Sequence, residues 1–133
     1  MSDSEPPQTG RGMYWTGVVM SAVPSLMLLM ASVMALSKAD AVVKGMSGQY
    51  GYPESAIQGI GAACLVSVVL YLIPRTAVLG AILLTGYLGG AVATHVHANE
   101  GWMFLMPVLF GALVWGGLFF RDARIRALVP WRK

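Results

Sequence analysis

Two histidines and two glutamates are the residues of this chain best suited to acid–base or ligand chemistry. His95 and His97 end one long apolar stretch, Glu100 follows them, and Glu54 begins another stretch. Side chains two residues apart on a helix point in nearly opposite directions, so the histidines are not expected to hold one metal ion together. We expect His95 to face the packed interior, where Glu54 and Tyr52 would reach it and form a small ligand-binding site. The competing interpretation is a structural cap at the helix ends.

The cysteine and the methionines, which could also take part in chemistry, are better explained by packing. The single cysteine, Cys64, excludes an internal disulfide and a cysteine-rich metal site, and it is expected to be a small buried hydrophobe. The long apolar stretches contain no Asp, Glu, Lys or Arg, which argues against a proton-driven transporter, because such proteins need an ionisable group near the midplane. No catalytic residue and no metal site are predicted, and an enzyme would require His95 and Glu54 in contact. Methionines recur every seven residues along the first stretch, at a spacing too wide for two of them to share an ion: Met13, Met20, Met27 and Met34.

Four apolar stretches must position these residues. They cover residues 12–37, 55–74, 76–99 and 101–120, and each is long enough for the about 20 residues that one membrane-spanning helix needs. Charged residues make up only 11% of the chain, against about 25% in soluble domains. The fold class predicted is therefore an all-α membrane protein, an antiparallel bundle of four transmembrane helices with short loops. The helices are expected at about Tyr14–Leu36, 55–73, Ala77–Val96 and Trp102–Phe120.

The polar ends of the chain define three regions. Residues 1–12 are predicted to be a disordered cytoplasmic tail, residues 13–120 the transmembrane domain, and residues 121–133 a basic tail in the membrane interface. In that last region, three arginines are expected to bind lipid headgroups: Arg121, Arg124 and Arg126.

The orientation follows from the positive charges. If both termini and the turn at Arg75 lie on one side, that side holds seven of the nine Lys and Arg residues, and the other side holds Lys38 and Lys44. The excess of positive charge marks the cytoplasmic side. The chain is therefore expected in a bacterial inner membrane, with both its N- and C-termini in the cytoplasm.

Small residues recur every fourth position in two of the stretches. Such rows let helix backbones approach closely, which is how helices associate in lipid. We expect these rows to pack against other helices, either of this chain or of another copy: Gly86, Gly90 and Thr94 in the third stretch, and Gly17, Ser21 and Ser25 in the first.

Several segments of the chain resemble the DoxX-like family of small bacterial membrane proteins. They are Gly51-Tyr52-Pro53-Glu54-Ser55, the segment from Leu72 to Ala77, the glycine-rich run from Gly86 to His95, and Arg121-Asp122. The resemblance implies a four-helix inner-membrane protein. The family takes its name from a subunit of a membrane complex that oxidises thiosulfate and passes the electrons to quinone.

Two functions are consistent with these features. The first is an accessory or structural subunit of a larger bacterial membrane complex, linked to redox chemistry or to quinone as the resemblance implies. The alternative is a stand-alone protein that binds or transports a small lipophilic molecule. The expected partners are membrane lipids and either other membrane subunits or further copies of the chain, and no nucleic acid. No recognisable motif encodes a cofactor, although a bound quinone or lipid would fit either function.

Overall fold

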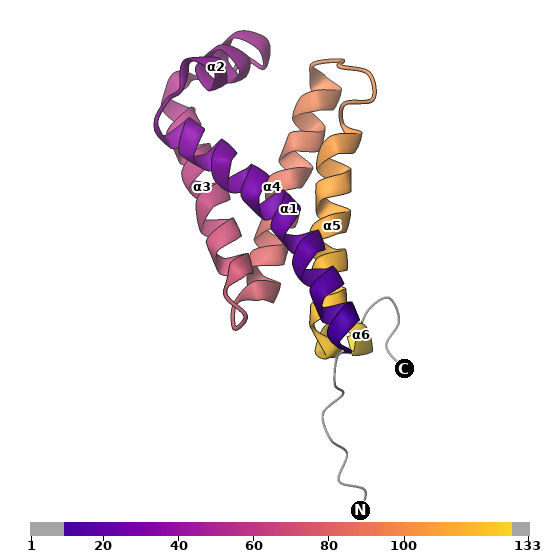
Figure 1. The fold of residues 1–133 in the computed structure, drawn as a ribbon. Helices are drawn as coiled ribbons and strands as arrows, with labels where there is room; N and C mark the ends of the chain where they lie inside the picture. The colour runs from indigo at the N-terminus through magenta and orange to yellow at the C-terminus, as the bar shows by residue number, and fades with distance from the viewer. Residues whose placement is uncertain (1–9, 129–133) are drawn as a thin grey trace, which may run out of the picture.

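The computed structural model describes residues 10–128, and every regular element in that range is helical. The parts of the two predicted tails at residues 1–9 and 129–133 lie outside the described residues. The elements, shown in Figure 1, are α1 (Arg11–Leu36), α2 (Asp40–Val43), the π-helical segment η1 (Lys44–Gln49), α3 (Glu54–Leu72), α4 (Ala77–His97), α5 (Leu105–Arg121) and α6 (Ala123–Leu128).

The four long helices run up and down the molecule. Helix α1 packs on α3 and α5, and α4 packs on the same two helices from the other side. Figure 1 shows α2 and η1 at one end, here called the α2 end, and the start of α1 together with α6 at the opposite α6 end. Helices α1, α3 and α4 are long and apolar enough to cross a membrane, whereas α5 is a shorter apolar helix. The all-helical, membrane-type fold predicted from the sequence is therefore confirmed.

The helix boundaries depart from the expected ones at two places. Helix α1 begins at Arg11 and so includes residues assigned to the N-terminal tail. Helix α5 begins at Leu105 instead of Trp102, because residues 101–104 form turns. Pro107 then falls in the first turn of α5, where its missing N–H costs no helical hydrogen bond.

A tight turn joins α3 to α4 at the α6 end, as Pro74 and Arg75 predict. The backbone N–H of Thr76 donates to the carbonyl of Ile73 at 3.0 Å. The Thr76 hydroxyl donates to the carbonyl of Leu70 at 2.8 Å and so satisfies one of the free carbonyls at the end of α3.

The core lies around Tyr71, a side chain with no exposed surface. Its hydroxyl donates to the carbonyl of Val114 at 2.7 Å and lies 2.8 Å from the hydroxyl oxygen of Ser21. One phenol thereby joins α3 to α5 and to α1. The apolar residues buried around it include Leu28, Cys64, Val68, Ala81, Leu84, Leu88, Val114 and Leu118.

Close packing of α1 on α5 depends on small residues. A Cβ added at Gly17 would lie 2.7 Å from the carbonyl oxygen of Gly117, closer than a side chain tolerates. Ser21 faces Gly117 one turn further along, and both it and Ser25 are buried. The predicted row Gly17, Ser21 and Ser25 thus lies inside the bundle, its first two residues against α5.

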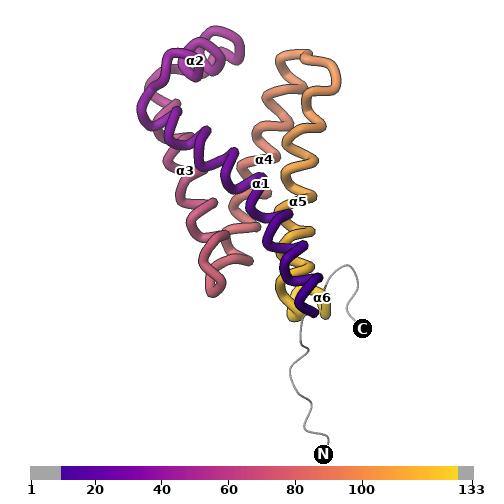
Figure 2. The backbone as a smooth tube through the Cα atoms, viewed as in Figure 1, coloured from indigo at the N-terminus to yellow at the C-terminus, as the bar shows by residue number. Residues whose placement is uncertain are grey.

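Helices α3 and α4 are closest at the turn and separate toward the α2 end, as the tube in Figure 2 shows. Gly80 lies so close to the backbone of Tyr71 that no side chain would fit, whereas a Cβ at Gly86 or Gly90 would meet nothing within 4 Å. Within this chain, therefore, the row Gly86, Gly90 and Thr94 is not a surface of close helix packing. The residue of α4 that allows close approach is Gly80.

Candidate functional site

A cavity of about 440 Å³ occupies the space between the diverging helices at the α2 end. Its walls come from η1 and the residues after it, from the first half of α3, and from the second half of α4. Most of the lining is apolar, with a few hydroxyl groups and one imidazole. The lining residues are Met46, Tyr50, Tyr52, Ile60, Gly86, Tyr87, Gly90, Ala91, Thr94 and His95.

The absence of side chains on one face of α4 makes room for this cavity. Gly86 and Gly90 are one helical turn apart on that face, and open space lies in front of both Cα atoms. Ala91 adds a single methyl group beside them. The face of α4 toward the cavity is therefore flat, and any larger residue at these positions would fill the space.

Two hydroxyl groups form a short chain of hydrogen bonds on the cavity wall. The Thr94 hydroxyl donates to the carbonyl of Gly90 at 2.9 Å, and its oxygen lies 2.6 Å from the hydroxyl oxygen of Tyr52. Because the proton of Thr94 is used in the first bond, Tyr52 is the donor in the second. This contact joins the segment before α3 to α4 across the cavity.

At the cavity mouth, three side chains donate hydrogen bonds to one carboxylate. Glu100, in the connection between α4 and α5, is bonded to Nδ1 of His95 and to the side-chain amide of Gln49. The Tyr50 hydroxyl donates to it as well, 3.1 Å from each carboxylate oxygen. The Tyr50 ring also stands edge-on to the His95 ring, with 5.7 Å between the ring centroids. Four residues from three segments are thereby held together around one negative charge.

The protonation states of this cluster follow from its hydrogen bonds. The bond from His95, helped by the bond from Tyr50, lowers the pKa of Glu100 despite its partial burial. Burial, and then the hydrogen bond to Glu100, raises the pKa of Tyr50. At neutral pH, Glu100 is therefore an anion that accepts, and Tyr50 is a neutral phenol that donates.

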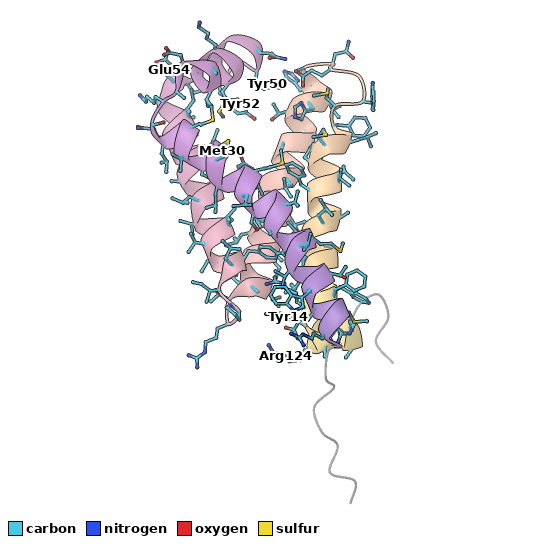
Figure 3. All side chains as sticks on the ribbon, viewed as in Figure 1. Tyr14, Met30, Tyr50, Tyr52, Glu54 and Arg124 are labelled. Atoms are coloured by element: carbon cyan, nitrogen blue, oxygen red, sulfur yellow. The ribbon has the colours of Figure 1, made fainter. Side chains whose placement is uncertain are left out.

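The structure brings together two of the three residues predicted to form the ligand site. His95 and Tyr52 both line the cavity. Glu54 does not join them, because it is exposed at the start of α3, and Figure 3 shows it on the outside of the molecule, away from Tyr50 and Tyr52. Glu100 occupies the place that the sequence analysis assigned to Glu54.

Sequence reasoning missed Tyr50 and Glu100 as partners of His95. Glu100 is five residues beyond His95, which was a usable signal, because a connection that folds back over the last helical turn brings such residues together. His97 is exposed on another face of α4. Within residues 10–128, no three His, Cys, Asp or Glu side chains are grouped closely enough to hold a metal ion.

At the opposite end, all three arginines expected to bind lipid headgroups contact other residues of the protein. The Arg121 guanidinium lies over the Tyr71 ring, 5.1 Å from its centroid, with Nε and Nη2 buried. Arg126 donates from Nη1 to the carbonyls of Phe119 and Phe120 at the end of α5. Arg124 pairs with Asp122, with 3.3 Å between Nε and Oδ1, but 82% of its side chain is exposed, so headgroup binding stays a prediction that fits this arginine best.

The fold defines a small, all-α integral membrane protein. A family model described as the DoxX-like family matches residues 19–117, and the chain belongs to that family. The predicted resemblance to this family is confirmed, and the matched region contains every residue that lines the cavity. No curated protein and no solved structure matches the chain.

Proposed function

We propose that this membrane protein binds a small lipophilic molecule in the cavity between α3 and α4. The observation that carries the proposal is the cavity itself, whose volume of about 440 Å³ falls within the roughly 300–1,000 Å³ typical of small-molecule sites. Mostly apolar walls with a few convergent hydrogen-bonding groups are also typical of such sites. Of the two functions that the sequence suggested, the geometry favours the binding protein.

The lining indicates what kind of molecule fits. Within residues 10–128, no Asp, Glu, Lys or Arg contributes to the cavity wall. Most of the hydrogen-bonding groups, which include the hydroxyls of Tyr52 and Thr94, gather toward the α2 end, whereas Gly86 and Gly90 lie deeper, with the Tyr87 hydroxyl as the one polar group beside Gly86. The proposed ligand is therefore uncharged, with an apolar body along the flat glycine face and a hydrogen-bonding group directed to the α2 end. Quinones and neutral lipids both have this chemistry.

We expect mass spectrometry of the protein purified from its native membrane in mild detergent to find one such compound in stoichiometric amount. In the variant Gly90→Leu, the new side chain occupies the cavity, and the compound should be lost. Gly89→Leu is the matched control, because Gly89 also has open space around it but does not line the cavity. Equal amounts of compound in both variants, or none in the unaltered protein, would contradict the proposal.

The accessory-subunit function remains a second candidate. An apolar groove of about 590 Å³ runs along the outer face of α5 near the α2 end, and a helix of another subunit would fit there as well as an acyl chain. Its lining is formed by Trp102, Met103, Leu105, Met106, Val108, Leu109 and Ala112. Unrelated chains that copurify in the same detergent preparation would favour this function over a stand-alone protein.

Helix α5 is proposed as the fourth membrane span. Its 17 residues extend about 25 Å at ~1.5 Å per residue. The turn before it, at the α2 end, adds the apolar residues Trp102, Met103 and Phe104 to the apolar length of this segment. Figure 1 shows α5 running beside α4 along the bundle. Four spans place the start of α1 and the end of α5 on the same side of the membrane.

We expect the α6 end to face the cytoplasm of a bacterial inner membrane. That end carries Arg11, Arg75 and the arginines of α6, and the α2 end carries Lys38 and Lys44. In a Cys64→Ala background, a cysteine at Ser2 should resist a membrane-impermeant maleimide added to intact cells, and a cysteine at Gly48 should react. Reaction at Ser2 with protection at Gly48 would reverse the orientation.

A further inference from the structure

The segment that connects α1 to α3 covers the α2 end of the cavity. It contains α2, η1 and the residues up to Tyr52, and it is called the strap here (residues 39–52). Its two helices pack mainly on each other and more sparsely on α1 and α3, their neighbours along the chain. Three strap residues line the cavity: Met46, Tyr50 and Tyr52.

Polar side chains join the strap to the opposite wall. Near the α3 end of the strap, Tyr52 bonds to Thr94 of α4. At the cavity mouth, Gln49 and Tyr50 both bond to Glu100, which is bonded in turn to His95 of α4. Glu100 thus has donors from both sides of the cavity, and removing its carboxylate would remove two of the strap's bonds to that wall.

We infer that the strap is a movable cover of the cavity and that Glu100 is the residue that holds it closed. This inference rests on the proposed function, since it concerns how a ligand reaches the cavity. When the strap swings away from α4, the mouth widens between Tyr50 and His95. The core around Tyr71 and Gly80 lies at the other end of the bundle and is not disturbed.

Two features make such a movement inexpensive. Opening breaks the bonds from Gln49 and Tyr50 to Glu100, whose side chain is 17% exposed, so water can replace them. Gly51 lies near the α3 end of the strap and has a φ of +76°, a conformation that glycine adopts without strain and from which it can rotate freely. Hinges of this kind are a few terminal residues that absorb the change in backbone angles.

The test measures the distance between the strap and α4 by pulsed electron paramagnetic resonance. Spin labels are attached in a Cys64→Ala background at Gly48→Cys and Val96→Cys, two exposed positions on the strap and on α4. The full chain is reconstituted in lipid nanodiscs without added ligand. Loss of the carboxylate in Glu100→Ala should shift the main distance peak to longer values. Most molecules should then no longer contribute to the peak at the shorter distance, which belongs to the closed strap.

Two further variants complete the test. Tyr50→Phe removes one donor to Glu100 and should shift the distribution in the same direction, and it serves alone if Glu100→Ala fails to fold. Glu54→Ala removes a carboxylate from the same end of the protein, outside the cluster, and should leave the distribution unchanged. An unchanged distance in Tyr50→Phe and Glu100→Ala, or an equal shift in Glu54→Ala, would overturn the inference. The measurement needs no bound ligand, so failure to find one would count against the proposed function alone.

Discussion

Replacing Gly80 with alanine is expected to destabilise the protein by about 3 kcal/mol, the upper range for overpacking a rigid site. The added Cβ would collide with the backbone of Tyr71, next to the short turn that joins α3 to α4. A backbone atom cannot move aside as the end of a flexible side chain can, so the two helices must separate and the surrounding core must open. The thermal unfolding midpoint in detergent would measure the loss.

Gly89→Ala is the matched control for this prediction. Gly89 lies on the same helix, is exposed, and has nothing within 4 Å of an added Cβ. Alanine favours a helix over glycine by up to about 1 kcal/mol, so this variant should unfold at the same temperature as the unaltered protein or slightly above it. Equal destabilisation of both variants would show that α4 tolerates no change at all and would remove the specific role of Gly80.

Removing one hydroxyl from the core should also weaken the bundle. Tyr71→Phe deletes the hydrogen bonds to Val114 and Ser21 and leaves the ring in place under Arg121. Hydrogen bonds between helices in lipid contribute about 1–2 kcal/mol at most, and we expect a loss of that size. Thermal unfolding in detergent would measure it, with Tyr14→Phe as the control, because Tyr14 is exposed. A Tyr71→Phe protein as stable as this control would show that packing alone holds these three helices together.

The amino-acid sequence by itself determines the helices and their order. Uncharged stretches of about 20 residues can satisfy their backbone groups in lipid only as helices. Pro74 and Arg75 end α3 and leave room only for a tight turn, so α3 and α4 must be antiparallel neighbours. The helix ends were predicted within three residues, with the largest errors at the starts of α1 and α5. The error at Trp102 arose because apolar residues can form a turn as well as a helix.

Tertiary structure decided which faces of the helices meet. In water, a polar face shows how a helix is rotated, but large apolar side chains are exposed on α1, α3, α4 and α5, as is typical of a membrane protein, so no polar face marks their rotation. The spacing of Gly86 and Gly90 is therefore the same for a face that packs on another helix and for a face that lines an open cavity, and the sequence could not distinguish the two. Likewise, Glu54 and Glu100 both lay near the level of His95, and only the rotation of α3 and the path of the connection after α4 brought Glu100 to it. Spacing along the chain defines which residues lie on the same face of a helix. The rotation of the helix defines what that face contacts, and a helix that is apolar on all sides gives no sign of its rotation in the sequence.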